Sequence, residues 1–119
     1  MGNEAISYDD VISRLQQRVA GFKPEDPELP HVAFGQLVAY LADQLETDSG
    51  EGEVRRIIGF IEDAASSSDE QVVELVVVSF IENLHNLGPR CQTVRAMFGP
   101  QTSKLARDYE HKGGGKVCP

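Results

Sequence analysis

The strongest constraint on the fold lies between residues 69 and 87, where apolar side chains recur at helical spacing. On a helix of 3.6 residues per turn they cover about half of the circumference, which is typical of a helix that contacts several neighbours. Ser68 and Gln71 have the spacing of a capping box, which marks a helix start. The sequence therefore predicts a central helix over 69–87, with a short strand over 72–78 as the alternative because valine favours β-structure. The apolar positions are Val72, Val73, Val76, Val77, Phe80, Ile81, Leu84 and Leu87.

Other amphipathic segments predict helices over 8–20, 31–45, 53–65, 90–98 and 101–110. Helix breakers separate them, including three prolines in the loop 23–30 and the pairs Gly88–Pro89 and Gly99–Pro100. Successive amphipathic helices with short turns predict an all-α fold, either a bundle of five to six helices or a short stack of helix pairs. We expect a single helical domain over 1–111 and a flexible Gly/Lys tail over 112–119.

Length and composition agree with one small folded domain. The chain has 119 residues, and its apolar fraction of 40% is enough for one packed core. No apolar run approaches the ~20 residues that a membrane-spanning helix needs, and the N-terminal residues lack the features of a signal peptide. We therefore expect a cytoplasmic protein, in which Cys91 and Cys118 stay reduced, although a disulfide between them is left open.

The charge is acidic and uneven along the chain. The formal net charge is −8; residues 1–87 hold 17 acids and 5 bases, whereas residues 88–119 hold 2 acids and 6 bases. An acidic body repels nucleic-acid phosphates and anionic membranes, and it attracts basic proteins. We therefore expect a protein partner, and neither nucleic acid nor membrane. The late bases are interpreted as partners of the acidic body or of helix C-termini; they are Arg90, Arg95, Lys104, Arg107, Lys112 and Lys116.

The sequence holds no P-loop, no dinucleotide-binding glycine motif and no nucleophile elbow. Its one pattern of metal-binding type is Glu82 followed three residues later by His85, which is half of the di-iron site of helical bundles. Both side chains fall opposite the apolar arc of their helix, so we interpret them as an exposed polar pair. We expect no enzyme activity, no catalytic residue, no cofactor and no metal, with a metal-dependent enzyme built on this pair as an alternative.

Surface carboxylates concentrate around two predicted turns, between the second and third helices and between the third and fourth. Because opposite charge speeds encounter with a basic protein, we expect these acids, together with Glu82, to contact a partner. Exposed aromatic anchors are expected among Tyr8, Phe22 and Tyr109. The predicted partner-binding residues are Asp43, Glu46, Asp48, Glu51, Glu53, Glu62, Asp63, Asp69, Glu70 and Glu82.

Two short segments carry a resemblance to a known kind of protein. They read Arg-Arg-Ile-Ile-Gly-Phe-Ile-Glu over 55–62 and Val-Ser-Phe-Ile-Glu-Asn-Leu over 78–84. Within about 29–87 the chain resembles a family of small uncharacterised helical bacterial domains that is similar to the immunity proteins of polymorphic toxin systems. The resemblance implies an inhibitor that occludes the active or substrate-binding surface of a basic toxin domain. Glu62 and Glu82 are the positions that it carries over.

Two functional hypotheses follow for a chain that binds proteins. An immunity-type inhibitor, as a monomer or a homodimer, would bind one cognate toxin tightly through its acidic surface. A general helical scaffold or adaptor would instead bind several partners weakly through an apolar groove.

Overall fold

A computed structural model describes residues 6–119 of the chain, so the first five residues of the predicted domain 1–111 lie outside the described part. No strand occurs within 6–119, which confirms the all-α prediction and excludes the strand alternative over 72–78. The segments named η1 and η3 are π-helical turns, and η2 is a 3-10 segment. The elements are α1 (Val11–Arg18), α2 (Pro30–Leu45), α3 (Glu51–Ala65), α4 (Glu70–Leu75), η1 (Val76–Phe80), η2 (Ile81–Arg90), α5 (Cys91–Ala96), α6 (Pro100–Tyr109) and η3 (Glu110–Gly114).

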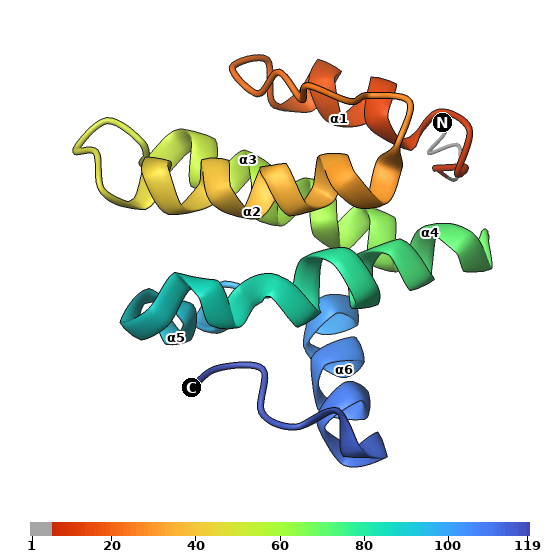
Figure 1. The fold of residues 1–119 in the computed structure, drawn as a ribbon, viewed down its shortest axis with the longest axis vertical. Helices are drawn as coiled ribbons and strands as arrows, with labels where there is room; N and C mark the ends of the chain where they lie inside the picture. Colours follow the sequence, from red (N-terminus) through yellow and green to blue (C-terminus); the bar gives the residue numbers. More distant parts are fainter. Residues whose placement is uncertain (1–5) are drawn as a thin grey trace.

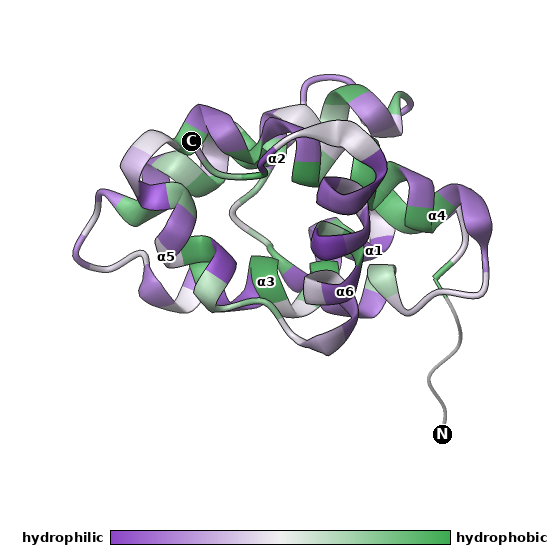
Figure 2. Cartoon of the chain, turned by 90° about the horizontal axis from the view of Figure 1, so that it is seen from below, coloured by the Kyte–Doolittle hydropathy of each residue, from purple (hydrophilic) through white to green (hydrophobic). Residues whose placement is uncertain are grey.

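The helices pack around one core, and every described element except η3 contributes buried residues to it. Figure 1 shows α2 and α3 running in opposite directions, with α1 above them and the run from α4 to η2 below. Three fully buried phenylalanines belong to this core: Phe34 from α2, Phe60 from α3 and Phe80 from η1. Figure 2, seen from below, shows α6 as mostly hydrophilic, in keeping with a helix that buries only Thr102 and Ala106. The fold is therefore a single all-α bundle with α6 as a peripheral element.

The predicted helix over 69–87 is helical throughout but is not one regular α-helix. It begins as α4, widens into η1 and then tightens into η2, and Figure 1 shows these parts as one continuous coil. In an α-helical projection, the buried positions of the second half are rotated relative to those of the first. A π-turn holds more residues per turn than an α-helix, so it reduces this rotation and keeps both halves facing the core. Gly88, with φ of 60°, ends the run before Pro89.

The cap of this helix differs from the prediction by one residue. The N-cap is Asp69, whose Oδ1 accepts a hydrogen bond from the Gln71 backbone N–H at 3.0 Å. Ser68 therefore does not form the predicted capping box with Gln71. A carboxylate at this position also interacts favourably with the positive end of the helix dipole.

The C-terminal segment 112–119 is not free along its whole length, which corrects the prediction of a flexible tail. Val117 and Cys118 are buried, and Cys118 forms a disulfide with Cys91 at the start of α5. The Val117 backbone N–H donates to Glu110 Oε2 at 2.9 Å, which holds the end of the chain against η3. The expectation that both cysteines stay reduced is corrected as well, because this structure contains no free cysteine among its described residues.

Candidate functional site

The α2–α3 turn brings five of the predicted partner-binding acids to one end of the molecule, and some of them are paired within the chain. Glu46 lies 2.9 Å from Arg90, measured from Oε2 to Nη1, and Glu51 lies 2.9 Å from Arg55. Both pairs are exposed, so each adds little to the free energy of folding. They do, however, offset part of the negative charge that a partner would meet.

Glu53, at the same end, is held by two neighbours. Its Oε2 accepts a hydrogen bond from the Tyr40 hydroxyl at 2.5 Å, and its Oε1 lies 2.9 Å from Arg56 Nη1. Burial of the phenol and this hydrogen bond raise the pKa of Tyr40 to about 12. A β-carbon at Gly21 would lie 2.5 Å from the Tyr40 oxygen, so the absence of a side chain at Gly21 lets the loop close over this pair. Glu53 therefore joins α2 to α3, and it is not a freely available contact.

The α3–α4 end shows the same pattern at two further predicted residues. Asp63 pairs with Arg18 of α1 at 2.8 Å, and the guanidinium of Arg18 also lies 5.8 Å from the centre of the Phe60 ring. Asp69 caps α4 and accepts a second hydrogen bond from the Tyr8 backbone N–H at 2.8 Å. Both acids fasten the N-terminal part of the chain to the bundle.

Glu62 is the most completely satisfied of the predicted residues. Its carboxylate accepts hydrogen bonds from the backbone N–H of Gln101 and of Thr102, both at 2.9 Å, and from the Thr102 hydroxyl at 2.8 Å. Burial alone would raise the pKa of Glu62, but these hydrogen bonds outweigh it and hold the pKa below its ordinary value. The acid therefore caps α6, which is a structural role that its position in α3 did not reveal.

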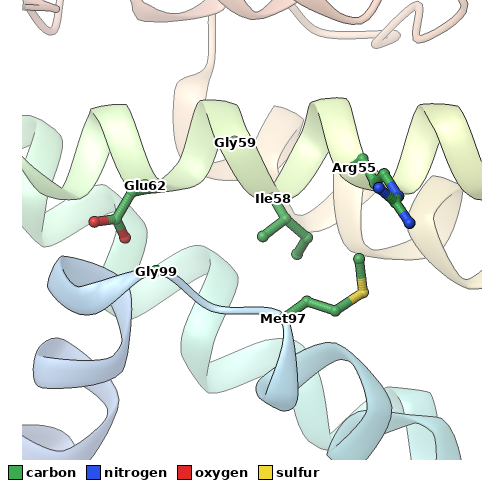
Figure 3. Close-up of a pocket in the computed structure, with 6 residues that line it drawn as sticks. All are labelled: Arg55, Ile58, Gly59, Glu62, Met97 and Gly99. Atoms are coloured by element: carbon green, nitrogen blue, oxygen red, sulfur yellow. The ribbon is translucent and has the colours of Figure 1, made fainter.

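A shallow pocket of about 300 Å³ lies beside this cap. Figure 3 shows the Glu62 carboxylate pointing toward the chain at Gly99, whereas the Met97 side chain lies under Ile58 and Arg55. A β-carbon at Gly99 would come within 2.5 Å of Glu62 Cδ, so glycine permits the approach. Both charged groups that line the pocket already have partners in the fold, because Glu62 caps α6 and Arg55 pairs with Glu51. Its lining residues are Arg55, Ile58, Gly59, Glu62, Met97 and Gly99.

Four of the ten predicted residues remain exposed, and their side chains have no ion-pair or hydrogen-bond partner within residues 6–119. They are Asp43 at the end of α2, Asp48 in the following turn, Glu70 in α4 and Glu82 in η2. Glu74 in α4 has the same status, and it completes an exposed line with Glu70 and Glu82. These carboxylates are free to meet a partner.

The structure also reveals a surface feature that sequence reasoning missed. In the described part of the chain the exposed large apolar side chains are Leu29 (49% exposed), Val32 (44%) and Val78 (40%). The pattern of the central helix held a signal for Val78, because this valine falls outside the apolar arc. No comparable signal marks Leu29 and Val32, whose exposure depends on how α2 lies against its neighbours.

Close to these residues, the His31 ring and the Ser79 hydroxyl form a hydrogen bond, with 2.5 Å between Nδ1 and Oγ. Ser79 is only 5% exposed, and its backbone carbonyl accepts from the Asn83 side chain at 2.8 Å. A serine and a histidine at this distance resemble part of a catalytic triad, but no carboxylate of residues 6–119 binds the histidine ring. The bond instead fastens the first turn of α2 to η1.

The predicted aromatic anchors are largely inside the protein. Phe22 is 4% exposed and packs against Tyr40 with ring centres 5.4 Å apart, so its prediction as an exposed anchor is wrong. Tyr8 and Tyr109 are partly buried and pack against the core. The large exposed apolar side chains of residues 6–119 are therefore aliphatic.

Glu82 and His85 lie on the exposed side of η2, as the helical projection predicted. The His85 Nδ1 atom lies 2.7 Å from the Glu82 backbone oxygen, so the ring binds its own helix. No group of three or more histidine, cysteine, aspartate or glutamate side chains suited to a metal ion is found among residues 6–119. The alternative of a di-metal enzyme has no ligand set in this part of the chain.

Two of the late bases are used within the fold. Arg90 binds Glu46 of the acidic body, which agrees with the interpretation of these bases as internal partners. Arg95 forms two hydrogen bonds with Glu110, at 2.6 and 2.9 Å. The bond to Arg95, together with the Val117 N–H, lowers the pKa of Glu110 to about 2.

Of three comparisons with known proteins, the comparison with family models gave a match. Neither a curated protein nor a solved structure was found that matches the chain. In the described residues, no helix is both long and apolar enough to cross a membrane. One family model covers residues 12–112, from α1 to η3. The chain therefore belongs to the family described as a domain of unknown function, DUF7674.

Proposed function

We propose that the protein is an immunity-type inhibitor that binds a basic toxin domain and covers the active or substrate-binding surface of that domain. The charge of two long segments carries this proposal. Residues 24–54 and 57–89 together contain 14 aspartates and glutamates and not one lysine or arginine. They include α2, most of α3 and all of α4 and η1, so a large part of the folded body carries acids only.

The exposed carboxylates without an internal partner are the part of this charge that can contact another protein. Asp43, Asp48, Glu70, Glu74 and Glu82 are exposed and have no partner within residues 6–119. An acid that is not paired within the protein can bind a cation of the partner at a lower cost in free energy, because no internal ion pair has to be broken first. Their field also steers a basic partner during encounter and raises the association rate.

The inhibition would follow from position and charge alone, without chemistry by this chain. A toxin that acts on nucleic acid carries a basic surface for the phosphates of its substrate. A rigid acidic domain can occupy that surface and exclude the substrate. Rigidity helps, since binding then orders few side chains and costs less conformational entropy.

The test is binding and inhibition with the product of the neighbouring gene. We expect the two purified proteins to form a 1:1 complex in calorimetry and to lose affinity as NaCl rises from about 50 mM to about 500 mM. The fourfold variant Asp43→Asn, Asp48→Asn, Glu70→Gln, Glu82→Gln should bind at least about tenfold more weakly. The variant Lys112→Gln, Lys116→Gln, which changes exposed bases of the same chain, serves as the control.

The outcomes separate the two protein-binding hypotheses. Salt-sensitive, stoichiometric binding that abolishes toxin activity supports the inhibitor. If the folded protein leaves the neighbouring gene product fully active and unbound, the inhibitor proposal is wrong, and a general helical adaptor becomes the better hypothesis.

A further inference from the structure

The exposed apolar side chains gather where the first turn of α2 meets η1. Leu29 is the N-cap of α2, Val32 lies in its first turn and Val78 lies in η1. The His31–Ser79 hydrogen bond joins the direct chain neighbours of the two valines. The valines therefore belong to the same contact between elements, although they are 46 positions apart in the sequence. Single exposed apolar residues are ordinary on a protein surface, but a group at one site marks an interaction surface.

The two elements stay side by side beyond this point. His31 binds Ser79, a β-carbon at Gly35 would lie 3.9 Å from the Asn83 side chain, and Glu46 binds Arg90. The residue numbers on both elements rise together along these contacts, so α2 and the run from η1 to η2 point in the same direction (Figure 1). The apolar group thus lies on a surface formed by two parallel helical elements, α2 and the run from η1 to η2.

Free carboxylates surround the apolar group. Glu74 and Glu82 lie four residues before and four residues after Val78, and both are exposed. Glu28 directly precedes Leu29 and is exposed as well. The side chains of all three acids have no ion-pair or hydrogen-bond partner among the residues that the structure describes, and neither α2 nor the run 69–89 contains a lysine or arginine. The surface therefore has an aliphatic centre and an acidic border.

We propose that this surface, called here the α2–η1 face and made of Leu29, Val32, Val78, Glu28, Glu74 and Glu82, binds a cationic amphipathic helix of the partner protein. The proposal rests on the proposed function for the basic character of the partner and adds the place and form of the contact. Aliphatic side chains of the partner helix cover Val32 and Val78, and its flanking lysines or arginines meet Glu74 and Glu82.

A helix fits this surface better than an extended segment. The described chain offers no sheet edge with unpaired backbone groups, so a strand would find no backbone partners there. Glu74 and Glu82 are eight residues apart, which is about 12 Å along a helix, so a little more than two turns (~2.2) of a partner helix span the distance between them. A helix with apolar residues at spacings of three and four places cations on both sides of its apolar stripe.

The first experiment uses synthetic helical peptides as probes. We will titrate a fluorescent leucine–lysine peptide of about 14 residues, ordered as an amphipathic helix, against the full chain and measure anisotropy. A peptide of the same composition in scrambled order and a leucine–glutamate peptide are the controls. We expect the ordered cationic peptide to bind at least about tenfold more tightly than either control.

Paired variants then test the place of binding. Val32→Ser with Val78→Ser should weaken binding of the ordered cationic peptide at least about tenfold. Ala20→Ser with Ala96→Ser, at two exposed alanines outside α2 and η1, should leave its affinity within about twofold. Glu74→Gln with Glu82→Gln should weaken binding and flatten its salt dependence. The matched pair Asp43→Asn with Asp48→Asn removes equal charge at the far end of α2 and should have little effect. Far-UV circular dichroism and the unfolding midpoint establish that each variant is folded.

The possible results distinguish a failure of the α2–η1 face from a failure of the proposed function. Equal loss from both charge pairs, or no loss from the valine pair in folded protein, overturns the α2–η1 face. If the cognate toxin binds but the valine pair does not affect it, the face is wrong and the inhibitor proposal stands. If the ordered peptide binds at the face while the neighbouring gene product is not bound at all, the face stands and the inhibitor proposal is wrong.

Discussion

Glu62 illustrates how a single carboxylate that looks like surface charge in the sequence becomes part of the fold. It lies near the C-terminal end of α3, yet its three hydrogen bonds go to the first residues of α6, about 40 positions later. We expect Glu62→Gln to lower the free energy of unfolding by about 1 kcal/mol, because the amide keeps only one good acceptor for these donors. Urea unfolding measures the change, with Glu74→Gln, at an exposed acid that has no side-chain partner within residues 6–119, as the control.

The pH dependence of this effect has a definite sign. The pKa of Glu62 is lower in the folded protein than in the unfolded chain, so its stabilisation is complete above the unfolded pKa and is lost as the pH falls through the folded pKa. The difference in the free energy of unfolding between the native protein and Glu62→Gln should therefore become smaller as the pH falls. A difference that stays constant down to about pH 2 would show that the charge of Glu62 does not contribute to the cap.

Glu110 allows a second single-residue test of how a carboxylate contributes to stability. Its bond to Arg95, with that from the Val117 N–H, lowers the pKa from an ordinary 4.5 to about 2. The stabilisation is thus present above about pH 4.5 and is lost toward pH 2. Since both side chains are about a quarter exposed, we expect Glu110→Gln to cost about 1–2 kcal/mol at pH 7. Unfolding curves between pH 2 and pH 7 measure this loss, with Glu74→Gln as the exposed control. Parallel curves for native protein and Glu110→Gln would contradict it.

At the scale of elements, the sequence was sufficient where a pattern is local. Each helix has its own apolar stripe, and prolines and glycines mark most of the ends, so the predicted helices agree with α1, α2, α3, α5 and α6 to within three residues at each end. The π-turn η1 was not predictable in this way, because it depends on how both halves of the run 69–87 meet the same core. The roles of Glu53, Glu62 and Asp69 depend on contacts between elements, and a linear pattern does not reveal such contacts.

The disulfide is the element-scale feature with the largest expected effect. It closes a loop of 27 residues between α5 and the chain end. Removing it by Cys118→Ser should lower the free energy of unfolding by about 2–4 kcal/mol and should expose the segment after Gly115 to proteolysis. Thermal unfolding with and without a reductant measures this loss, and the variant should no longer respond to the reductant.

The same bond makes the redox state of the two cysteines a test of the compartment expected from the sequence. A protein that stays in the cytosol should keep both thiols reduced, as we expected from the sequence, whereas the bond in this structure fits an oxidising compartment. Thiol counting after rapid alkylation of the protein in its native cells distinguishes them. Two free thiols in folded protein, with no effect of reductant on the unfolding temperature, would contradict the disulfide.

On the scale of the whole molecule, net charge is the property that the sequence gives directly and the structure refines. Of the ten acids predicted to bind a partner, Glu46, Glu51, Glu53, Glu62, Asp63 and Asp69 have partners inside the fold. The sequence predicted that the surface charge is negative but not which carboxylates are free. Ion pairs between elements depend on distances in the folded protein, which the sequence does not provide. It also missed the aliphatic centre of the α2–η1 face, because exposure at Val32 results from packing.

The excess of acids predicts how the stability of the whole molecule responds to salt. The net charge is −8, and two segments of more than thirty residues contain no lysine or arginine, so the folded chain repels itself. Raising NaCl from about 50 mM to about 500 mM screens this repulsion and should raise the unfolding temperature by about 2–5 °C. Screening also weakens the ion pairs, but most are exposed and contribute little, so the relief of repulsion prevails.

A charge reversal at a free acid isolates this effect from other actions of salt. Asp48 is exposed and unpaired among the described residues, so Asp48→Lys removes repulsion without breaking an ion pair or hydrogen bond of its side chain. We expect the variant to unfold at a higher temperature than the native protein in low salt and to gain less from added NaCl, with Asp48→Asn between the two. Calorimetry at both salt concentrations measures this order. An unfolding temperature that falls with salt in the native protein would mean that its ion pairs outweigh the repulsion, and the acidic body would then owe its stability to pairs such as Glu46–Arg90.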